Sequence, residues 1–302
     1  MPQSPSRNPY RRLRRLVGRT FFGLPFDGTL GWTLQRPAEG PSIDIVRFGA
    51  CETREAELSH TVNTPIGWPR YLADQLGRHG IGVGWQSIWT WNLGDFPKTP
   101  EELWKRRRRH RGQPDLVLIQ AGGWHAIRHV LGFSPRVLGL RENVGVWLGR
   151  GVRPAWRGLS VWLQVVGRLP AYQGTRELEE FLDLARQEWP DAQFAIQELL
   201  EPALAGMCDP KRVQQINDDL RALAERRGIG WVPRPDLGTG MRLRCANGVN
   251  LNRRGSELAA RHYARWILDN VAIEGGEALA EDGRPPLVAQ ASPQVTTHAP
   301  HE

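Results

Sequence analysis

The chain has 302 residues, of which 40% are hydrophobic, and a formal net charge of +8. This length allows one large domain or two small ones, and the apolar fraction is sufficient for a full core. No run of about 18 or more apolar residues occurs, which argues against a membrane-spanning helix. The basic N-terminal segment lacks a small-residue cleavage site, so no signal peptide is predicted.

Three cysteines lie far apart, at Cys51, Cys208 and Cys245, without the CxxC pair typical of zinc or redox centres. We therefore expect a cytoplasmic protein with reduced thiols, no metal and no cofactor. Much of the positive charge comes from the Arg-rich runs at 11–15 and 104–111. These runs are either anion-contacting surfaces, for phosphates or lipid headgroups, or simply solvated charge. No zinc-finger or RNA-recognition signature is present, so nucleic-acid binding is not expected.

The composition divides the chain into three parts. Residues 1–41 are basic and rich in Pro, Gly and Arg, which is typical of an arm on the surface of a domain. Residues 273–302 lack apolar periodicity, so this tail is predicted to be disordered. The folded unit is therefore expected to span residues 42–272.

Within this unit, short apolar runs alternate with amphipathic ones along the chain. The apolar runs predict buried strands and the amphipathic runs predict helices, with Thr99 and Asp209 placed as N-caps. Strands alternating with helices predict a parallel sheet with helices on both faces. In chain order, strands are expected at 43–49, 81–89, 114–122, 192–199 and 228–233, and helices at 67–80, 99–111, 174–190, 209–228 and 253–270.

One segment interrupts the alternation. Residues 130–171 are longer than a normal connection and set Val, Leu and Trp among arginines. Two interpretations are open for this insertion. It is either a cap over a ligand site or a membrane-surface helix, or it is an extra helical hairpin that covers the sheet.

Three junctions of the predicted sheet carry short motifs. Ligands of open parallel sheets bind at the carboxyl ends of the strands, so these junctions are the candidate site. The first is Gly49-Ala50-Cys51-Glu52-Thr53, the second is Gly122-Gly123-Trp124-His125, and the last is Asn247-Gly248-Val249-Asn250-Leu251-Asn252.

Together, over residues 42–270, these motifs resemble the SGNH (GDSL-type) hydrolase family. The resemblance implies a three-layer α/β/α, flavodoxin-like fold with a five-stranded parallel sheet. It places Cys51 at the nucleophile and keeps the family's threonine as Thr53. It also implies the following substitutions: Trp124 at the oxyanion Asn, His125 at the next Asp, and Asn247 and Asn250 at the acid and the base. The family's oxyanion glycine is not found, because Gly84 lies too early.

These substitutions argue against conventional ester hydrolysis. A carboxamide is neither a base nor an acid near pH 7, so Asn250 cannot accept and return a proton. The ring of Trp124 replaces an oxyanion-holding amide, and the loss of one such donor costs about a hundred- to a thousand-fold in rate. The residues expected to surround a ligand are Gly49, Ala50, Glu52, Thr53, Gly122, Gly123, Trp124, Asn247 and Asn250.

Two functional hypotheses follow. In the first, the chain binds an acyl, glycosyl or other small ligand without hydrolysing it, or serves as a scaffold for a partner. In the second, Cys51 is a thiol nucleophile for acyl transfer or hydrolysis, with His125 as its base. The alternative for these two residues is structural, with Cys51 as a small buried side chain and His125 as a turn residue. A carboxylate at Glu52 would raise the pKa of the thiol and so opposes the second hypothesis.

Thirteen tryptophans allow two interpretations as well. Rings near the ligand edge or in the insertion can line an apolar or sugar-binding cleft, or they can pack in the core. The relevant residues are Trp85, Trp89, Trp91 and Trp124 at the edge, and Trp147, Trp156 and Trp162 in the insertion.

Overall fold

The structure is a computed structural model of the chain. It describes residues 29–33, 40–49, 68–90, 93–106, 112–126, 128, 168–200, 208–238, 241–243 and 251–273. The predicted tail beyond residue 273, the Arg-rich runs at 11–15 and 107–111, and residues 130–167 of the insertion lie outside these ranges. The organisation into arm, insertion and tail therefore stays a prediction.

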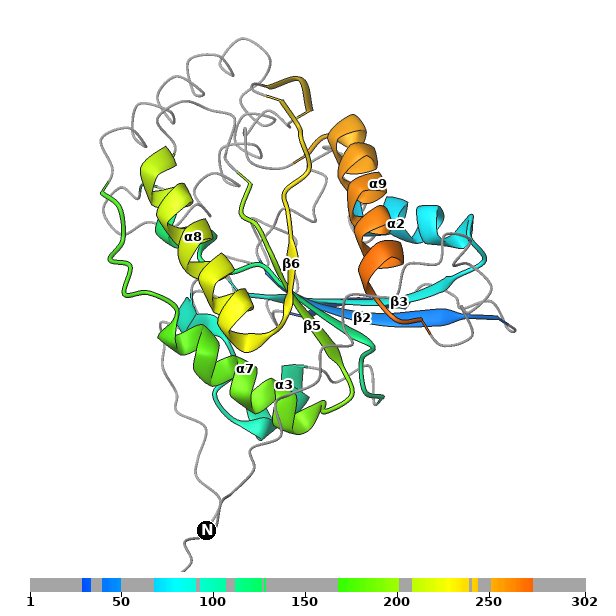
Figure 1. The fold of residues 1–302 in the computed structure, drawn as a ribbon, viewed down its shortest axis with the longest axis horizontal. Helices are drawn as coiled ribbons and strands as arrows, with labels where there is room; N and C mark the ends of the chain where they lie inside the picture. The colour runs from blue at the N-terminus through cyan, green and yellow to red at the C-terminus, as the bar shows by residue number, and fades with distance from the viewer. Residues whose placement is uncertain are drawn as a thin grey trace, which may run out of the picture.

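Five parallel strands form the sheet that the sequence predicts (Figure 1). Numbered along the chain, their spatial order is 2-1-3-4-5, which is the flavodoxin-like order. The predicted fold class is therefore confirmed. The parallel strands are β2 (Ser42–Gly49), β3 (Gly82–Trp89), β4 (Leu116–Ile119), β5 (Gln193–Gln197) and β6 (Gly230–Val232).

A sixth strand, β1 (Thr29–Thr33), comes from the segment predicted as an arm. It pairs antiparallel with β3, with Thr29 opposite Ile88 and Thr33 opposite Gly84. The sequence analysis did not predict this strand. β1 occupies the outer edge of β3, whose backbone donors and acceptors would otherwise be a template for pairing with another chain.

Helices cover both faces of the sheet, as predicted (Figure 1). On one face, Phe48 of β2 packs against Phe181, with ring centroids 4.7 Å apart. On the other, Trp68 contacts Tyr263 at 4.6 Å between ring centroids. The first face holds α3 (Pro100–Arg106), α7 (Arg176–Glu188) and α8 (Pro210–Arg227), and the second holds α2 (Trp68–Gly77) and α9 (Arg253–Asn270).

Both predicted N-caps are confirmed. The Thr99 hydroxyl accepts from the backbone N–H of Glu102 at 3.2 Å. The Asp209 carboxylate accepts from the backbone N–H groups of Lys211 and Arg212 at 3.0 and 3.4 Å. These bonds satisfy donors that a helix start leaves without intrahelical partners, and so define where α3 and α8 begin.

Within the described residues, no helix is long and apolar enough to cross a membrane.

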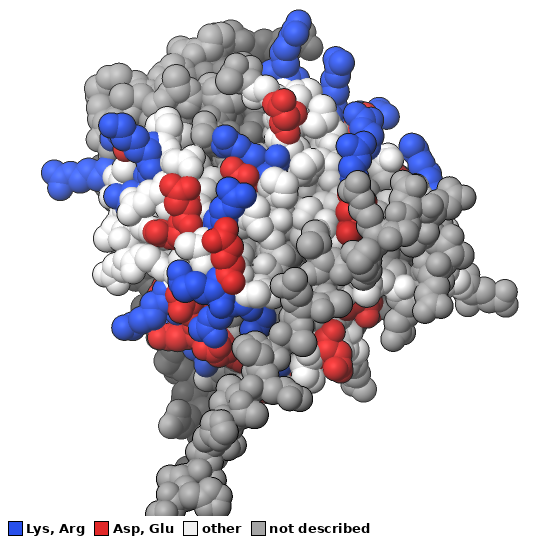
Figure 2. Space-filling view, in the orientation of Figure 1, with Lys and Arg blue, Asp and Glu red and all other residues white. Residues whose placement is uncertain are grey.

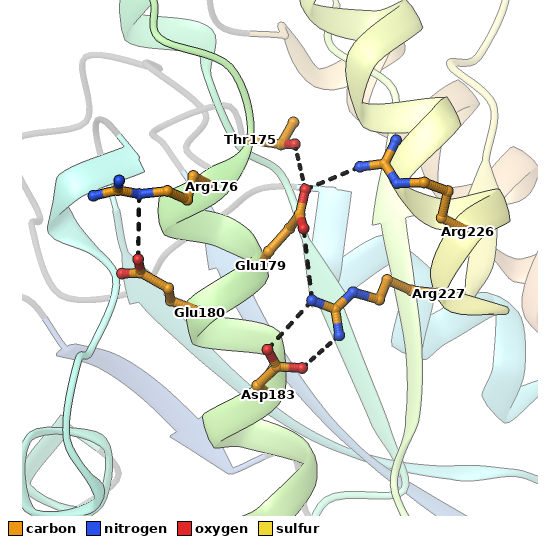
Figure 3. A network of polar contacts seen from close by, with 7 residues as sticks. All are labelled: Thr175, Arg176, Glu179, Glu180, Asp183, Arg226 and Arg227. Carbon is orange, nitrogen blue, oxygen red and sulfur yellow. Dashed lines mark hydrogen bonds and ion pairs between the residues drawn. The ribbon is translucent and has the colours of Figure 1, made fainter.

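An ion-pair network joins α7 to the end of α8 (Figure 3). Arg227 lies 2.5 Å from Asp183 and 3.6 Å from Glu179, and Arg226 lies 2.9 Å from Glu179. The hydrogen bond to Asp183 is the main cause of the raised pKa of Arg227. Figure 2 shows these charges intermixed over α7, beside the end of α8. The network aligns two helices of the same layer.

Replacing Arg227 tests the strength of this network. We expect Arg227→Met to lower the free energy of unfolding by about 1 kcal/mol. Partly exposed ion pairs that form a network stabilise a fold by amounts near the upper end of what surface ion pairs contribute. Arg176→Met is the matched control, since among the described residues Arg176 forms an ion pair with Glu180 alone, on the exposed face of its own helix. Urea unfolding measures both, and equal losses in the two variants would show that the network adds nothing.

Candidate functional site

The carboxyl ends of β2, β3 and β4 lie side by side at one edge of the sheet. The backbone N–H of Thr90 donates to the carbonyl of Gly49 at 3.1 Å, and that of Gln120 donates to Phe48 at 2.8 Å. Gly49 begins the first predicted motif, and the Gly122–His125 motif follows Gln120 directly. The first two junctions therefore leave the sheet next to each other.

Gly49 ends β2 with its backbone against the guanidinium group of Arg47. A Cβ atom added at Gly49 would lie 2.9 Å from Arg47 Cζ. This is closer than a Cβ atom approaches a neighbouring heavy atom, and the arginine is buried and cannot easily move away. Glycine at this position thus makes room for the charged side chain beneath the first junction.

Arg47 is 1% exposed and belongs to the central strand of the sheet. Its Nε donates to Gln197 Oε1 at 2.9 Å, and a second guanidinium nitrogen donates to Gln120 Oε1. Its Cζ lies 5.5 Å from the centroid of a Trp68 ring, within the range of a cation–π contact. We refer to Arg47, Gln120, Gln197 and Trp68 as the Arg47 cluster.

Strand register brings the polar members of this cluster together. Arg47 is paired with Leu118 of β4, and Leu118 with Ala195 of β5. Gln120 and Gln197 each follow two residues later, so alternation places them on the face that Arg47 occupies. This is the face covered by α2 and α9, at the carboxyl end of the strands.

The sequence analysis missed the Arg47 cluster, although a signal was present. Each polar residue lies within or directly after a buried apolar run: Arg47 lies within "IDIVRFG", Gln120 follows "LVLI" and Gln197 follows "FAI". A polar residue at an inward position of a strand buried on both faces needs a buried partner. This rule identifies all three residues as needing buried partners, but it does not predict that they contact one another.

The second junction is a tight turn that begins at Gly122. This residue has a φ of +84°, and a Cβ atom there would lie 2.7 Å from Ile216 Cγ2. Its carbonyl accepts from the backbone N–H of His125 at 2.9 Å, within the short helix α4 (Gly123–Ala126). Both the left-handed backbone and the close approach of α8 require glycine at this position.

The His125 ring is oriented by the segment that precedes α7. Its Nδ1 lies 2.7 Å from the carbonyl oxygen of Ala171, and its ring centroid lies 5.7 Å from that of Tyr172. A carbonyl only accepts, so Nδ1 carries the hydrogen and the neutral ring keeps its lone pair on Nε2. Tyr172 contacts α8 through Arg212, whose Cζ lies 5.9 Å from the centroid of the tyrosine ring. Burial raises the pKa of the Tyr172 phenol.

Several predicted site residues lie outside the described part of the chain. Their roles therefore stay predictions. Gly123 is the first residue of α4, and the side chain of Trp124 lies outside the described part of the structure. The residues outside are Ala50, Cys51, Glu52, Thr53, Asn247 and Asn250.

Trp85 belongs to the core and does not line a cleft. It is 1% exposed, its ring centroid lies 5.2 Å from that of Trp68, and its Nε1 donates to Ser87 Oγ at 2.8 Å. Of the two interpretations open for the tryptophans, core packing holds for this one. The side chain of Trp89, and Trp91, Trp147, Trp156 and Trp162 altogether, lie outside the description.

Among the described residues, no group of three His, Cys, Asp or Glu side chains could hold a metal ion. Cys208 is a buried cysteine in the core between the sheet and α8. It has little access to reagents in solution.

No protein-family model and no curated protein matches the sequence. Three solved structures similar to the chain are a Clostridium thermocellum family 3 carbohydrate esterase, esterase EstA from Pseudoalteromonas sp. and a lipase/acylhydrolase from Enterococcus faecalis. Their sequence identities are 12%, 15% and 16%, and their TM-scores 0.45, 0.44 and 0.41. They align with 76%, 74% and 74% of this chain, and with 96%, 96% and 95% of their own. Likenesses this distant assign no reaction to the chain.

The strand order, the parallel direction of β2 to β6 and the two helical layers are those that the sequence motifs imply. The fold is a three-layer α/β/α fold of the flavodoxin-like class. Function has to come from the residues at the edge of the sheet, because one fold carries many activities.

Gly122 provides a test of how tightly the second junction is built. We expect Gly122→Ala to lower the free energy of unfolding by about 2 to 4 kcal/mol, from left-handed backbone strain together with the clash against Ile216. Gly174→Ala is the matched control, since Gly174 has a φ of +83° with nothing within 4 Å of an added Cβ. It should lose only about 1 kcal/mol. Equal losses in chemical denaturation would contradict the close approach of α8.

Proposed function

We propose that the chain is a non-hydrolytic member of this fold that binds a small acyl- or glycosyl-containing ligand at the carboxyl edge of its sheet. The observation that carries this proposal is the Arg47 cluster beneath the adjacent ends of β2, β3 and β4. Buried polar side chains at this edge supply oriented hydrogen-bonding groups where open parallel sheets bind ligands.

The amides at the last junction support binding without hydrolysis. Ester hydrolysis by a serine or cysteine nucleophile needs a base to take the proton of the nucleophile and return it to the leaving group. The resemblance places Asn250 at that base and Asn247 at its acidic partner. Neither amide titrates near neutral pH, so neither residue can accept the proton of the nucleophile and return it to the leaving group.

A second candidate function is thiol-dependent acyl transfer or ester hydrolysis through Cys51, and the orientation of His125 favours it. The bond from Nδ1 to the Ala171 carbonyl holds the ring in the tautomer whose Nε2 can accept a proton. Histidines that act as bases are commonly held in this way. This candidate requires Cys51 to approach Nε2, and the two functions differ in what they predict for Cys51.

Binding and turnover of p-nitrophenyl octanoate distinguish the two functions. Under the first, the ester quenches tryptophan fluorescence saturably, while nitrophenolate release stays at the rate in buffer. Cys51→Ala should then bind the ester within about twofold of the wild type, because the thiol makes no covalent bond. Release above background that disappears in Cys51→Ala would replace the first function by the second.

Alkylation by iodoacetamide tests the second function through the state of the thiol. If Cys51 only fills space, its labelling rate should follow an ordinary thiol pKa of about 8.5 and be the same in His125→Ala. His125→Asn is the matched control, because the Asn amide can still donate to Ala171 but cannot act as a base. A low-pKa labelling profile lost in both variants would support a Cys51–His125 pair, and one restored by Asn would show a structural role. Buried Cys208 serves as the slow internal reference.

A further inference from the structure

We infer that the outer face of α9 binds the anionic surface of a lipid bilayer. The inference goes beyond the proposed function and does not depend on it, because this face of α9 belongs to none of the predicted junction motifs. It starts from three arginines of α9, which we call the α9 arginine row: Arg254, Arg261 and Arg265.

Helix geometry places the three arginines in one line along the outside of α9. Positions 254, 261 and 265 are separated by close to whole helical turns, so their side chains leave the helix within about 40° of one another. The row extends over about 16 Å, at 1.5 Å of rise per residue. All three side chains are exposed, whereas Tyr263 and Ile267, on the opposite side of the helix, are buried against the sheet.

The α9 arginine row carries positive charge that nearby carboxylates do not pair. None of its three members forms an ion pair with another described residue, and Glu257 on the same helix lies 3.0 Å from Arg253. The arginines of α7 and α8 differ, as in the pair of Arg226 with Glu179 at 2.9 Å. Figure 2 shows blue side chains gathered over the upper part of α9, where blue and red are intermixed over α7. The excess of positive charge on this surface therefore attracts a negatively charged partner.

Leucines beside the row favour a bilayer as that partner. Leu258 lies one turn after Arg254, and Leu268 lies one turn after Arg265, and both are half-buried. Helices that bind bilayer surfaces combine arginines with apolar side chains, because the headgroups meet the charge and the acyl chains beneath them meet the apolar atoms. A nucleic acid or an acidic peptide segment offers only polar surface to the two leucines.

The shape of the row also fits a bilayer. A bilayer presents negative headgroups over a plane, so a straight row of arginines can contact several of them without matching a fixed spacing. Arg254 follows the last predicted junction by two residues, and α9 begins at Arg253. A bilayer bound to α9 would therefore lie near the edge of the sheet where the acyl or glycosyl ligand is proposed to bind.

Sedimentation of the full chain with lipid vesicles tests the inference. Vesicles of phosphatidylcholine with about one third phosphatidylserine should bind the chain, and vesicles of phosphatidylcholine alone should not. Replacing Arg254, Arg261 and Arg265 together by Gln should lower the partition coefficient about a hundredfold, because each basic residue near an anionic surface contributes about fivefold. Arg261→Glu alone should lower it about twentyfold, and it serves as the readout if the triple variant does not fold.

The matched control is the replacement of Arg176, Arg221 and Arg226 by Gln. It removes the same number of positive charges from the layer of α7 and α8, where each of these arginines has a carboxylate partner. This variant should bind the phosphatidylserine vesicles within about threefold of the wild type. An equal loss in both triple variants would show that only net charge matters and would overturn the inference.

Three other outcomes would overturn the inference as well. The first is no binding of the wild type to the phosphatidylserine vesicles, and the second is full binding by the variant without the α9 arginine row. The third is binding of poly-glutamate or duplex DNA as tight as binding of the vesicles and lost in the same variant, which would show a general anion-binding surface. The proposed function is tested separately, because the binding of p-nitrophenyl octanoate is measured without vesicles.

Discussion

The fold depends on the burial of β2 on both faces at the centre of the sheet. Its side chains alternate between two apolar layers, with Phe48 directed to α7 and Ile43 and Ile45 to α2 and α9. Hydrogen bonding to β3 on one side and β4 on the other holds its register. Because both layers and both neighbours meet at this strand, a charged side chain in it is tolerated only where its hydrogen bonds are met. Arg47 occupies such a position through Gln120 and Gln197.

Local pattern is sufficient to predict most of this architecture. The five parallel strands are short apolar runs and the helices are amphipathic, so their burial follows from residues that are neighbours in sequence. β1 could not be found in this way, because "TLGWT" lies in a segment rich in Gly and Pro and becomes a strand only by pairing with β3. The edge that it covers is a property of the assembled sheet and not of any local stretch.

The candidate site also has a part that the local sequence predicts and a part that depends on the assembled sheet. Gly49 and Gly122 stand out in the sequence as members of junction motifs, and the structure adds a reason for each: a guanidinium group beneath one and α8 against the other. The contact between Arg47 and Gln197 spans 150 residues along the chain. It exists because β4 lies between β2 and β5, which no motif encodes. Motifs thus mark where the chain leaves the sheet, whereas strand order decides which side chains meet below.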